Sequence, residues 1–281
     1  MKTSTQLKAL IRNLSKEKNV KSEILIRNFM LEKLLERISL SEYKNQFILK
    51  GGMLIASIVG VETRSTVDLD TTIRGFKLNE NEIERVFNEI LAVHIDDGLY
   101  LTLLKIENIR DDSEYPGIRV SINAVFDKTK QTLKVDITTG DRITPSAIEY
   151  PFKTMFGDSE ISVLAYNLET VFAEKLETIL VRGTTNTRMR DFYDVYILMH
   201  LHEQDLDELI LKKAFQETAI YRGSYKLIEV NAAEYVLMIE ESKELENHWK
   251  QYRLKNEYAT NVEWFQALSS VRKVLNKLQV I

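Results

Sequence analysis

Three aspartates in the first half of the chain have the type and spacing that suit binding of a divalent cation. Asp68 and Asp70 stand two apart in the segment TVDLD. In a β-strand such residues project from one face, about 6.6 Å apart along the chain. Asp136, in LKVDITTG, is a third acid on a segment that could lie beside the first. Carboxylate oxygens are the ligands that Mg²⁺ prefers, so the pattern indicates a cation site, although a lone D-x-D is more often a solvated strand edge.

A glycine pair precedes these acids and suits contact with phosphate. Gly51 and Gly52 follow the apolar run FIL, and a helix is expected from about Met53. Glycines at a strand-to-helix turn let backbone N–H groups approach phosphate oxygens beside the positive end of the helix. A tight turn without a ligand is the alternative. Strand, glycines, helix and acidic strand together match the front of a nucleotidyltransferase site, in which two metal ions stabilise the attacking and leaving oxygens.

Five short motifs in order resemble those of a known family. They are K-G-G at Lys50 to Gly52, R-x-T-x-D-L-D at Arg64 to Asp70, K-V-D-I-T-T-G-D around Asp136, A-E-K at Ala173 to Lys175, and R-D-F-Y-D at Arg190 to Asp194. Each motif alone is weak, but the set and its order are fairly specific. The chain is similar to the AbiEii-type nucleotidyltransferase-like toxins of bacterial abortive-infection toxin–antitoxin systems, which are related to the MenT toxins.

The resemblance implies a role for each matching residue. It implies Asp68 and Asp70 as metal ligands, helped by Asp136, with Mg²⁺ as cofactor. It implies nucleotide contacts by Lys50, Gly51, Gly52, Thr66 and Lys175, and catalytic roles for Asp68, Asp70, Lys175 and Asp191. The implied reaction transfers a nucleotide from a triphosphate, GTP or CTP being candidates, to the 3′ end of tRNA. The implied setting is growth arrest in phage defence, with a separately encoded antitoxin that forms no stable complex with the toxin.

Lys175 also draws attention by its position alone. It lies beside an apolar stripe of Phe172, Leu176 and Ile179 on an expected helix. A lysine there costs stability unless its ammonium reaches a partner or a cleft, or extends to solvent. An ammonium that reaches a partner or a cleft would suit a role in neutralising charge on a leaving group.

The motif that follows Lys175 contains two acids on one helical face, Asp191 and Asp194. Arg190 is spaced to pair with Asp194 at i,i+4. Asp191 is the better candidate for chemistry and Asp194 for a structural role. The loop from Arg182 to Arg190 is expected to be solvated, although its arginines could contact an RNA backbone or the nucleotide.

These residues are carried by two kinds of segment. Helical periodicity covers residues 3 to 40 and about 79 to 93, and short segments rich in β-branched residues lie between about 47 and 140. After Tyr166 the chain has helical patterns to its end. The pattern predicts an α+β (α/β) fold: a nucleotidyltransferase-like lobe with a mixed sheet over residues 1–162 and a helical lobe over 163–281.

The composition limits the location and the partners. The chain has 281 residues, a formal net charge of −4 and no cysteine. The absence of cysteine excludes disulfides and thiolate metal sites and favours a cytoplasmic location. Apolar runs fall short of the roughly 20 residues that cross a bilayer, so no membrane partner is expected. The acidic balance means that any RNA contact must be local.

Two alternatives to nucleotide transfer remain open from the sequence. The same turn and carboxylates could serve a protein kinase-like phosphotransferase that moves the γ-phosphate. The chain could also be a non-catalytic regulator that binds a nucleotide without reaction.

Overall fold

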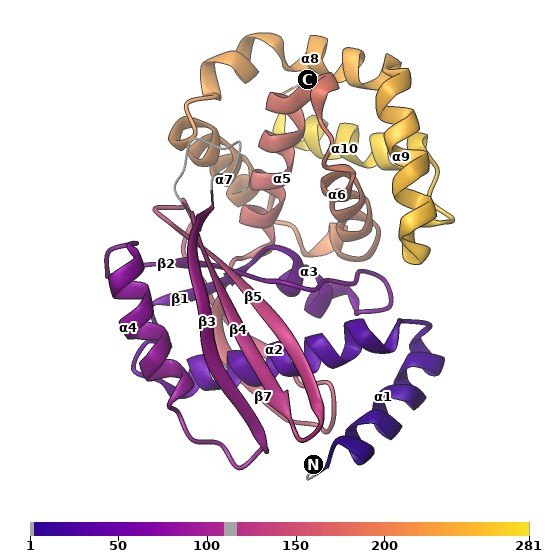
Figure 1. The fold of residues 1–281 in the computed structure, drawn as a ribbon. Helices are drawn as coiled ribbons and strands as arrows, with labels where there is room; N and C mark the ends of the chain where they lie inside the picture. The colour runs from indigo at the N-terminus through magenta and orange to yellow at the C-terminus, as the bar shows by residue number, and fades with distance from the viewer. Residues whose placement is uncertain (1–2, 110–116, 281) are drawn as a thin grey trace. The chain divides into compact units, whose positions relative to one another are not determined.

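A computed structural model describes residues 3–109 and 117–280, which form two compact units (Figure 1). The first unit comprises Met1–Gly140 and Ala147–Tyr166, and the second comprises Asp141–Ser146 and Asn167–Ile281. The sequence places the boundary between residues 162 and 163. In the structure the division falls after Tyr166, and the short segment Asp141–Ser146 belongs to the second unit.

The first unit is built on one seven-stranded mixed sheet of order β3-β4-β5-β2-β1-β7-β6. The strands are β1 (Phe47–Lys50), β2 (Leu69–Ile73), β3 (Leu99–Ile109), β4 (Gly117–Phe126), β5 (Thr129–Thr139), β6 (Ile148–Lys153) and β7 (Glu160–Ala165). The β2/β5 and β1/β7 pairs are parallel, and the other neighbours are antiparallel. The mixed α/β fold expected from the sequence is confirmed.

Strands β6 and β7 were not predicted. Only one residue of β6, Phe152, is buried, so the strand lacks the alternation that marks a half-buried strand. It also contains Pro151, which cannot donate a ladder hydrogen bond. The proline is tolerated because β6 lies at the edge of the sheet and pairs only with β7.

The described residues of the first unit form the helices α1 (Ser4–Lys18), α2 (Ser22–Leu40), α3 (Gly51–Val59) and α4 (Glu80–Leu91). Helix α2 packs behind the β3–β4–β5 ladder in Figure 1. Its Phe29 meets Phe126 of β4 edge to face, with ring centroids 6.2 Å apart. Burial of such apolar side chains contributes about 1.5 to 3 kcal/mol each, so the packing of α2 stabilises the sheet.

The second unit is helical, as the pattern after Tyr166 predicts. Its α-helices are α5 (Leu168–Arg182), α6 (Met189–His202), α7 (Glu208–Tyr221), α8 (Tyr225–Glu241), α9 (Lys243–Lys255) and α10 (Trp264–Leu278). Aromatic rings hold the C-terminal helices together: Trp264 lies 5.0 Å from Phe192 of α6 and 5.6 Å from Trp249 of α9, centroid to centroid. Trp249 also donates its indole N–H to the carbonyl of Val262.

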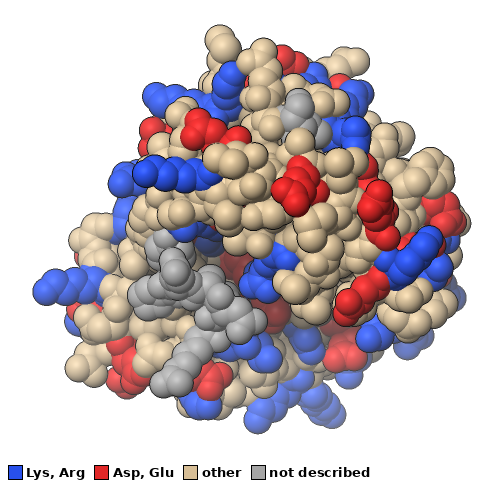
Figure 2. All heavy atoms as spheres, turned by 90° about the horizontal axis from the view of Figure 1, so that it is seen from above, with Lys and Arg blue, Asp and Glu red and all other residues tan. Residues whose placement is uncertain are grey.

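Acidic and basic side chains are interspersed on the face of the molecule shown in Figure 2. This mixture accords with the net charge of −4. Within residues 3–109 and 117–280, no helix is both long and apolar enough to cross a membrane.

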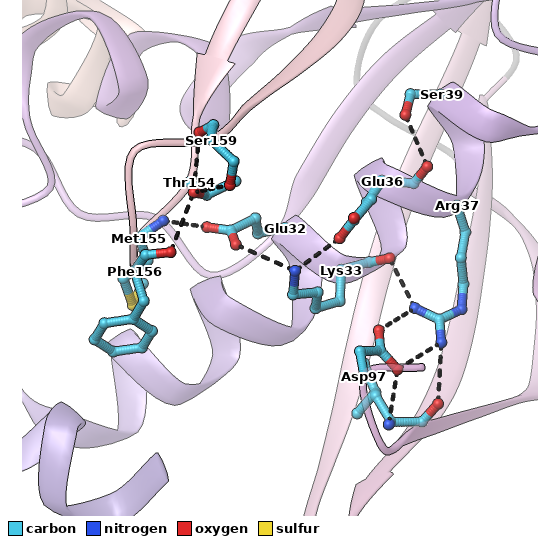
Figure 3. Close-up of polar contacts among 11 residues, drawn as sticks. Glu32, Lys33, Glu36, Arg37, Ser39, Asp97, Thr154, Met155, Phe156 and Ser159 are labelled. Atoms are coloured by element: carbon cyan, nitrogen blue, oxygen red, sulfur yellow. Dashed lines mark hydrogen bonds and ion pairs between the residues drawn. The ribbon is translucent and has the colours of Figure 1, made fainter. Parts of the chain in front are cut away.

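A network of buried charges ties α2 to the rest of the first unit (Figure 3). Arg37 binds the carboxylate of Asp97 through both terminal nitrogens, at 2.8 and 3.0 Å, and donates to the carbonyl of Leu99. Glu32 accepts a 2.6 Å hydrogen bond from the backbone N–H of Met155. Burial raises the pKa of Glu32 to about 7. These contacts join the helix both to the start of β3 and to the turn between β6 and β7.

Candidate active site

A row of four charged residues crosses the centre of the sheet, each on a neighbouring strand. The strand register places Lys50 opposite Asp70, Asp70 opposite Asp136, and Asp136 opposite Arg119. Residues in register project from the same face of a sheet. The pairing of β2 with β5 therefore brings together Asp70 and Asp136, which are far apart in the sequence. At the end of the row, the Lys50 ammonium lies 5.5 Å from the ring centroid of Tyr166.

The first glycine of the turn is required by its backbone and by its neighbour. Gly51 has a φ of +59°, a conformation that side chains with a Cβ rarely adopt. A Cβ at this position would lie 2.3 Å from Oδ2 of Asp70. The backbone N–H of the next residue, Gly52, donates a 2.9 Å hydrogen bond to the same oxygen. The turn therefore holds the Asp70 carboxylate in place at the start of α3.

The second glycine leaves room for two buried polar side chains. A Cβ at Gly52 would lie 2.6 Å from both the Arg64 guanidinium and the Thr66 hydroxyl. Arg64 is 1% exposed and Thr66 is 5% exposed. The Thr66 hydroxyl lies 3.4 Å from the carbonyl oxygen of Asp68, which it can reach as a donor. Arg64 and Thr66 thus brace the segment that leads into the acidic strand.

Asp68 lies immediately before β2, which begins at Leu69, so the sequence placed the strand start too early. Burial raises the pKa of both Asp68 and Asp70, and the charge of Asp136 raises them further. The Gly52 N–H opposes the rise at Asp70, and Lys134 and Arg119 oppose it at Asp68. Carboxylates that repel one another in a partly buried site favour a bound cation.

Arg119 is a member of the site that the sequence did not reveal. Its Nε and one terminal nitrogen each donate a 2.7 Å hydrogen bond to the Asp136 carboxylate, one to each oxygen. The alternation of GIRVSINAVF predicts a strand, but only the β4/β5 register shows which acid lies opposite the arginine. The bidentate pair offsets part of the charge of Asp136 and fixes its orientation.

The donor set fits a magnesium ion held by two carboxylates better than one held by three. In the part of the chain that the structure describes, no group of three or more His, Asp or Glu side chains could hold a metal. Mg²⁺ is often bound by one or two carboxylates and keeps several waters for substrate phosphates. Asp68 and Asp70 supply such a pair, while both oxygens of Asp136 accept hydrogen bonds from Arg119.

Lys175 of α5, in the second unit, is held by two acids of α6. Its ammonium lies 2.6 Å from Oδ1 of Asp191 and 2.9 Å from Oδ2 of Asp194. All three side chains are largely buried, Asp194 completely. Asp194, for which the sequence suggested Arg190 as partner, is thus paired with Lys175. The other Asp191 oxygen lies 3.3 Å from the half-exposed Arg188.

The residues named from the sequence therefore fall into two groups. The first unit holds Lys50, Gly51, Gly52, Thr66, Asp68, Asp70 and Asp136. The second unit holds Lys175, Asp191 and Asp194. Of the arginines in the loop before α6, Arg188 contacts this second group through Asp191.

Solved structures share this fold. A candidate nucleotidyltransferase from H. pylori has a TM-score of 0.50 and 17% sequence identity, covering 92% of this chain and 98% of that one. The protein JHP933 from Helicobacter pylori has the same score and identity, with 92% and 94% covered. Comparison with curated proteins finds no matching relative.

The family comparison covers both units. The model of the nucleotidyl transferase AbiEii toxin family, type IV toxin–antitoxin system, matches residues 33–274. The match spans the glycine turn, the acidic row and the Lys175 group, and leaves all of α1 and parts of α2 and α10 outside. The chain therefore belongs to the AbiEii family of nucleotidyl transferase toxins.

Proposed function

We propose that this toxin transfers a nucleotide from a nucleoside triphosphate to the 3′ end of tRNA in the cytoplasm, with Mg²⁺ as cofactor. Modification of that end blocks translation and arrests growth, which protects a bacterial population against phage. A separately encoded antitoxin counteracts the toxin without a stable complex. The observation that carries the proposal is the Asp70 carboxylate, fixed by the Gly52 N–H at 2.9 Å and in register with Asp136.

Asp68 and Asp70 are the residues that would hold the cation. When bound, Mg²⁺ offsets negative charge on the triphosphate and on the attacking oxygen. The Gly52 N–H occupies one side of the Asp70 carboxylate at Oδ2, which orients the other oxygen. Asp136 adds negative charge beside the pair, and its own position is set by Arg119. Preorganisation of this kind lowers the barrier because the carboxylates need not reorient during the reaction.

Lys50, the glycine turn and Lys175 also contribute to binding the triphosphate. Lys50 supplies a positive charge in the row, next to Asp70. Apart from the Gly52 N–H, which is donated to Asp70, the turn offers the other backbone N–H groups at the start of α3 to phosphate oxygens. Lys175 neutralises charge that develops on the leaving pyrophosphate. Asp191 and Asp194 hold its ammonium at 2.6 and 2.9 Å, which fixes the position of the charge.

Incubation of the protein with each α-labelled triphosphate, Mg²⁺ and total tRNA tests this function. We expect label at the RNA 3′ end from one preferred nucleotide, GTP or CTP. Asp70→Asn should abolish labelling, because the neutral amide lacks the charge that attracts the cation. If well-folded Asp70→Asn protein still labels the RNA, the assignment of Asp70 as a cation-binding residue is contradicted.

The same assay separates the two alternatives. A kinase-like enzyme would transfer label from γ-labelled and not from α-labelled triphosphate, and the label would appear on protein. A non-catalytic regulator would bind a nucleotide and label neither RNA nor protein.

A further inference from the structure

One face of the β3–β4–β5 ladder is polar and open, and it is continuous with the acidic row. On the opposite face Val120 and Val135 are buried, together with Phe126, which contacts helix α2. On the open face, Lys130 and Lys134 of β5 are exposed, and Tyr100 of β3 is 73% exposed. In Figure 1 this ladder lies in front of α2. We call the open side the polar face.

The register arranges the polar face in rows that lead to the candidate site. Tyr100 shares a row with Lys130, and Lys105 shares the next charged row with Lys134. Arg119 and Asp136 form the row after that. Residues two apart on a strand are separated by about 7 Å, so Lys134 lies about 7 Å from Asp136 along β5 and Lys130 about 20 Å from it.

A bulge in β3 gives the face its second row. The pairing of β3 with β4 shifts between Leu103 and Lys105. Without the bulge, regular alternation through Leu104 would point Leu104 toward the open side and Lys105 toward the core. The bulge therefore places Lys105 on the same side as Lys134.

Lys134 connects the face with the cation site. The β2/β5 register pairs Leu69 with Val135, so Asp68, one residue earlier, is beside Lys134 when the register is continued. In agreement, the charge of Lys134 lowers the pKa of Asp68 against the rise caused by burial.

The polar face carries a local positive excess despite the acidic chain. Lys105 pairs with Glu107, and Arg119 pairs with Asp136. Among the described residues, Lys130 and Lys134 take part in no ion pair; the Asp68 carboxylate beside Lys134 offsets part of its charge, and the charge of Lys130 stays uncompensated. Exposed lysines in line with an anionic reaction centre suit a polyanion that follows the strand, and the nearby Tyr100 ring offers a platform for a base.

We propose that the polar face binds the backbone of the acceptor RNA and leads its 3′ hydroxyl to Asp68 and Asp70. The inference rests on the proposed transfer to RNA and names the surface that the acceptor uses. Lys130 and Lys134 contact phosphates, and Tyr100 stacks on a base at the end of the face remote from the acids. This local surface accounts for RNA binding by a chain whose net charge is −4.

Binding of end-labelled total tRNA, without triphosphate or Mg²⁺, tests the inference apart from catalysis. Each phosphate contact to a single strand contributes roughly −0.7 to the slope of log affinity against log salt, so Lys130→Gln with Lys134→Gln should reduce the slope by about 1.4. The corresponding loss of affinity is on the order of 25-fold at about 0.1 M salt. Tyr100→Ala should weaken binding about fivefold or more and leave the slope unchanged, because stacking releases no counterions.

A matched control removes two other exposed lysines of the first unit, Lys44 and Lys77, which lie in loops outside the ladder. Lys44→Gln with Lys77→Gln makes the same change in net charge and should retain wild-type affinity and slope. Wild-type affinity and slope in the Lys130 and Lys134 double variant, with its thermal unfolding unchanged, would overturn the inference. Equal losses in both double variants would also overturn it, since binding would then follow net charge alone.

The test also separates this inference from the proposed function. The protein could bind RNA in a salt-dependent way through Lys130 and Lys134 and yet transfer no label to RNA. That result would support the binding surface and refute the proposed reaction. If the wild-type chain binds no RNA and transfers nucleotide to protein instead, the proposal that the polar face binds RNA is refuted.

Discussion

Replacement of Gly51 by alanine should impair the function of the cation site far more than it lowers the stability of the fold. The new Cβ would lie 2.3 Å from Oδ2 of Asp70 and 2.7 Å from its Cβ and Cγ, so the whole side chain must move and not only its tip. An ordinary contact begins at 3.4 Å, so Oδ2 must retreat by roughly 1 Å. A shift of that size in a reacting group can lower the rate by about a hundredfold. The positive φ of +59° adds a backbone penalty of about 1 to 2 kcal/mol.

Gly183 supplies the control for this experiment. Its φ is +49°, and a Cβ there would meet no atom within 4 Å. Both alanine variants should lower the unfolding midpoint by a few degrees. Only Gly51→Ala should also lose nucleotidyl transfer, about a hundredfold, and binding of Mn²⁺ measured by spectroscopy as a stand-in for Mg²⁺. If Gly51→Ala transferred nucleotide as fast as Gly183→Ala, the argument that the turn positions Asp70 would be wrong.

Three other substitutions test separate parts of the molecule. Arg119→Gln leaves Asp136 uncompensated, so Mn²⁺ should bind severalfold more tightly, while Asp136→Asn should weaken it; equal affinities in a titration would contradict the electrostatic role. Asp194→Ala removes one of two anions around buried Lys175 and should lower the free energy of unfolding in denaturant by about 3 kcal/mol. Glu32 has its pKa raised by burial from 4.5 to about 7, so the folded chain holds more protons than the unfolded chain between those values. Stability should therefore fall by up to roughly 3 kcal/mol as pH rises through that window, and Glu32→Gln should remove the fall in thermal unfolding curves.

The fold was predictable where burial is one-sided and repeats along an element. Strand β4 alternates buried and half-buried positions along nearly its whole length, and α4 has its buried residues at helical spacing. β6 could not be found in this way, because a mostly exposed edge strand has no such period. The bulge at Leu104 was equally hidden, since it puts Lys105 on the face opposite to that given by regular alternation without altering the local composition.

In the candidate site, the types of the functional residues could be predicted from the sequence, but the partners of those residues could not. Asp68, Asp70 and the glycines were identifiable because chemistry limits which residues can occupy such a turn and strand. Partners depend on register or on tertiary packing, which no short window of sequence contains. Arg119 stands opposite Asp136 only through the β4/β5 ladder, and Asp194 pairs with Lys175 across two helices.

That difference changes how the third carboxylate should be understood. From spacing alone, Asp136 is one of three equivalent acids around a cation. In the sheet it is half of a bidentate ion pair with Arg119, and its charge acts on Asp68 and Asp70 by raising their pKa. A divalent cation at Asp68 and Asp70 would lower the repulsion among all three acids. The guanidinium partly performs that task before the cation binds, so Arg119 and the cation compete for the same negative charge. Arg119 therefore sets how strongly the site attracts its metal, and the opposite effects expected from Arg119→Gln and Asp136→Asn follow from that competition.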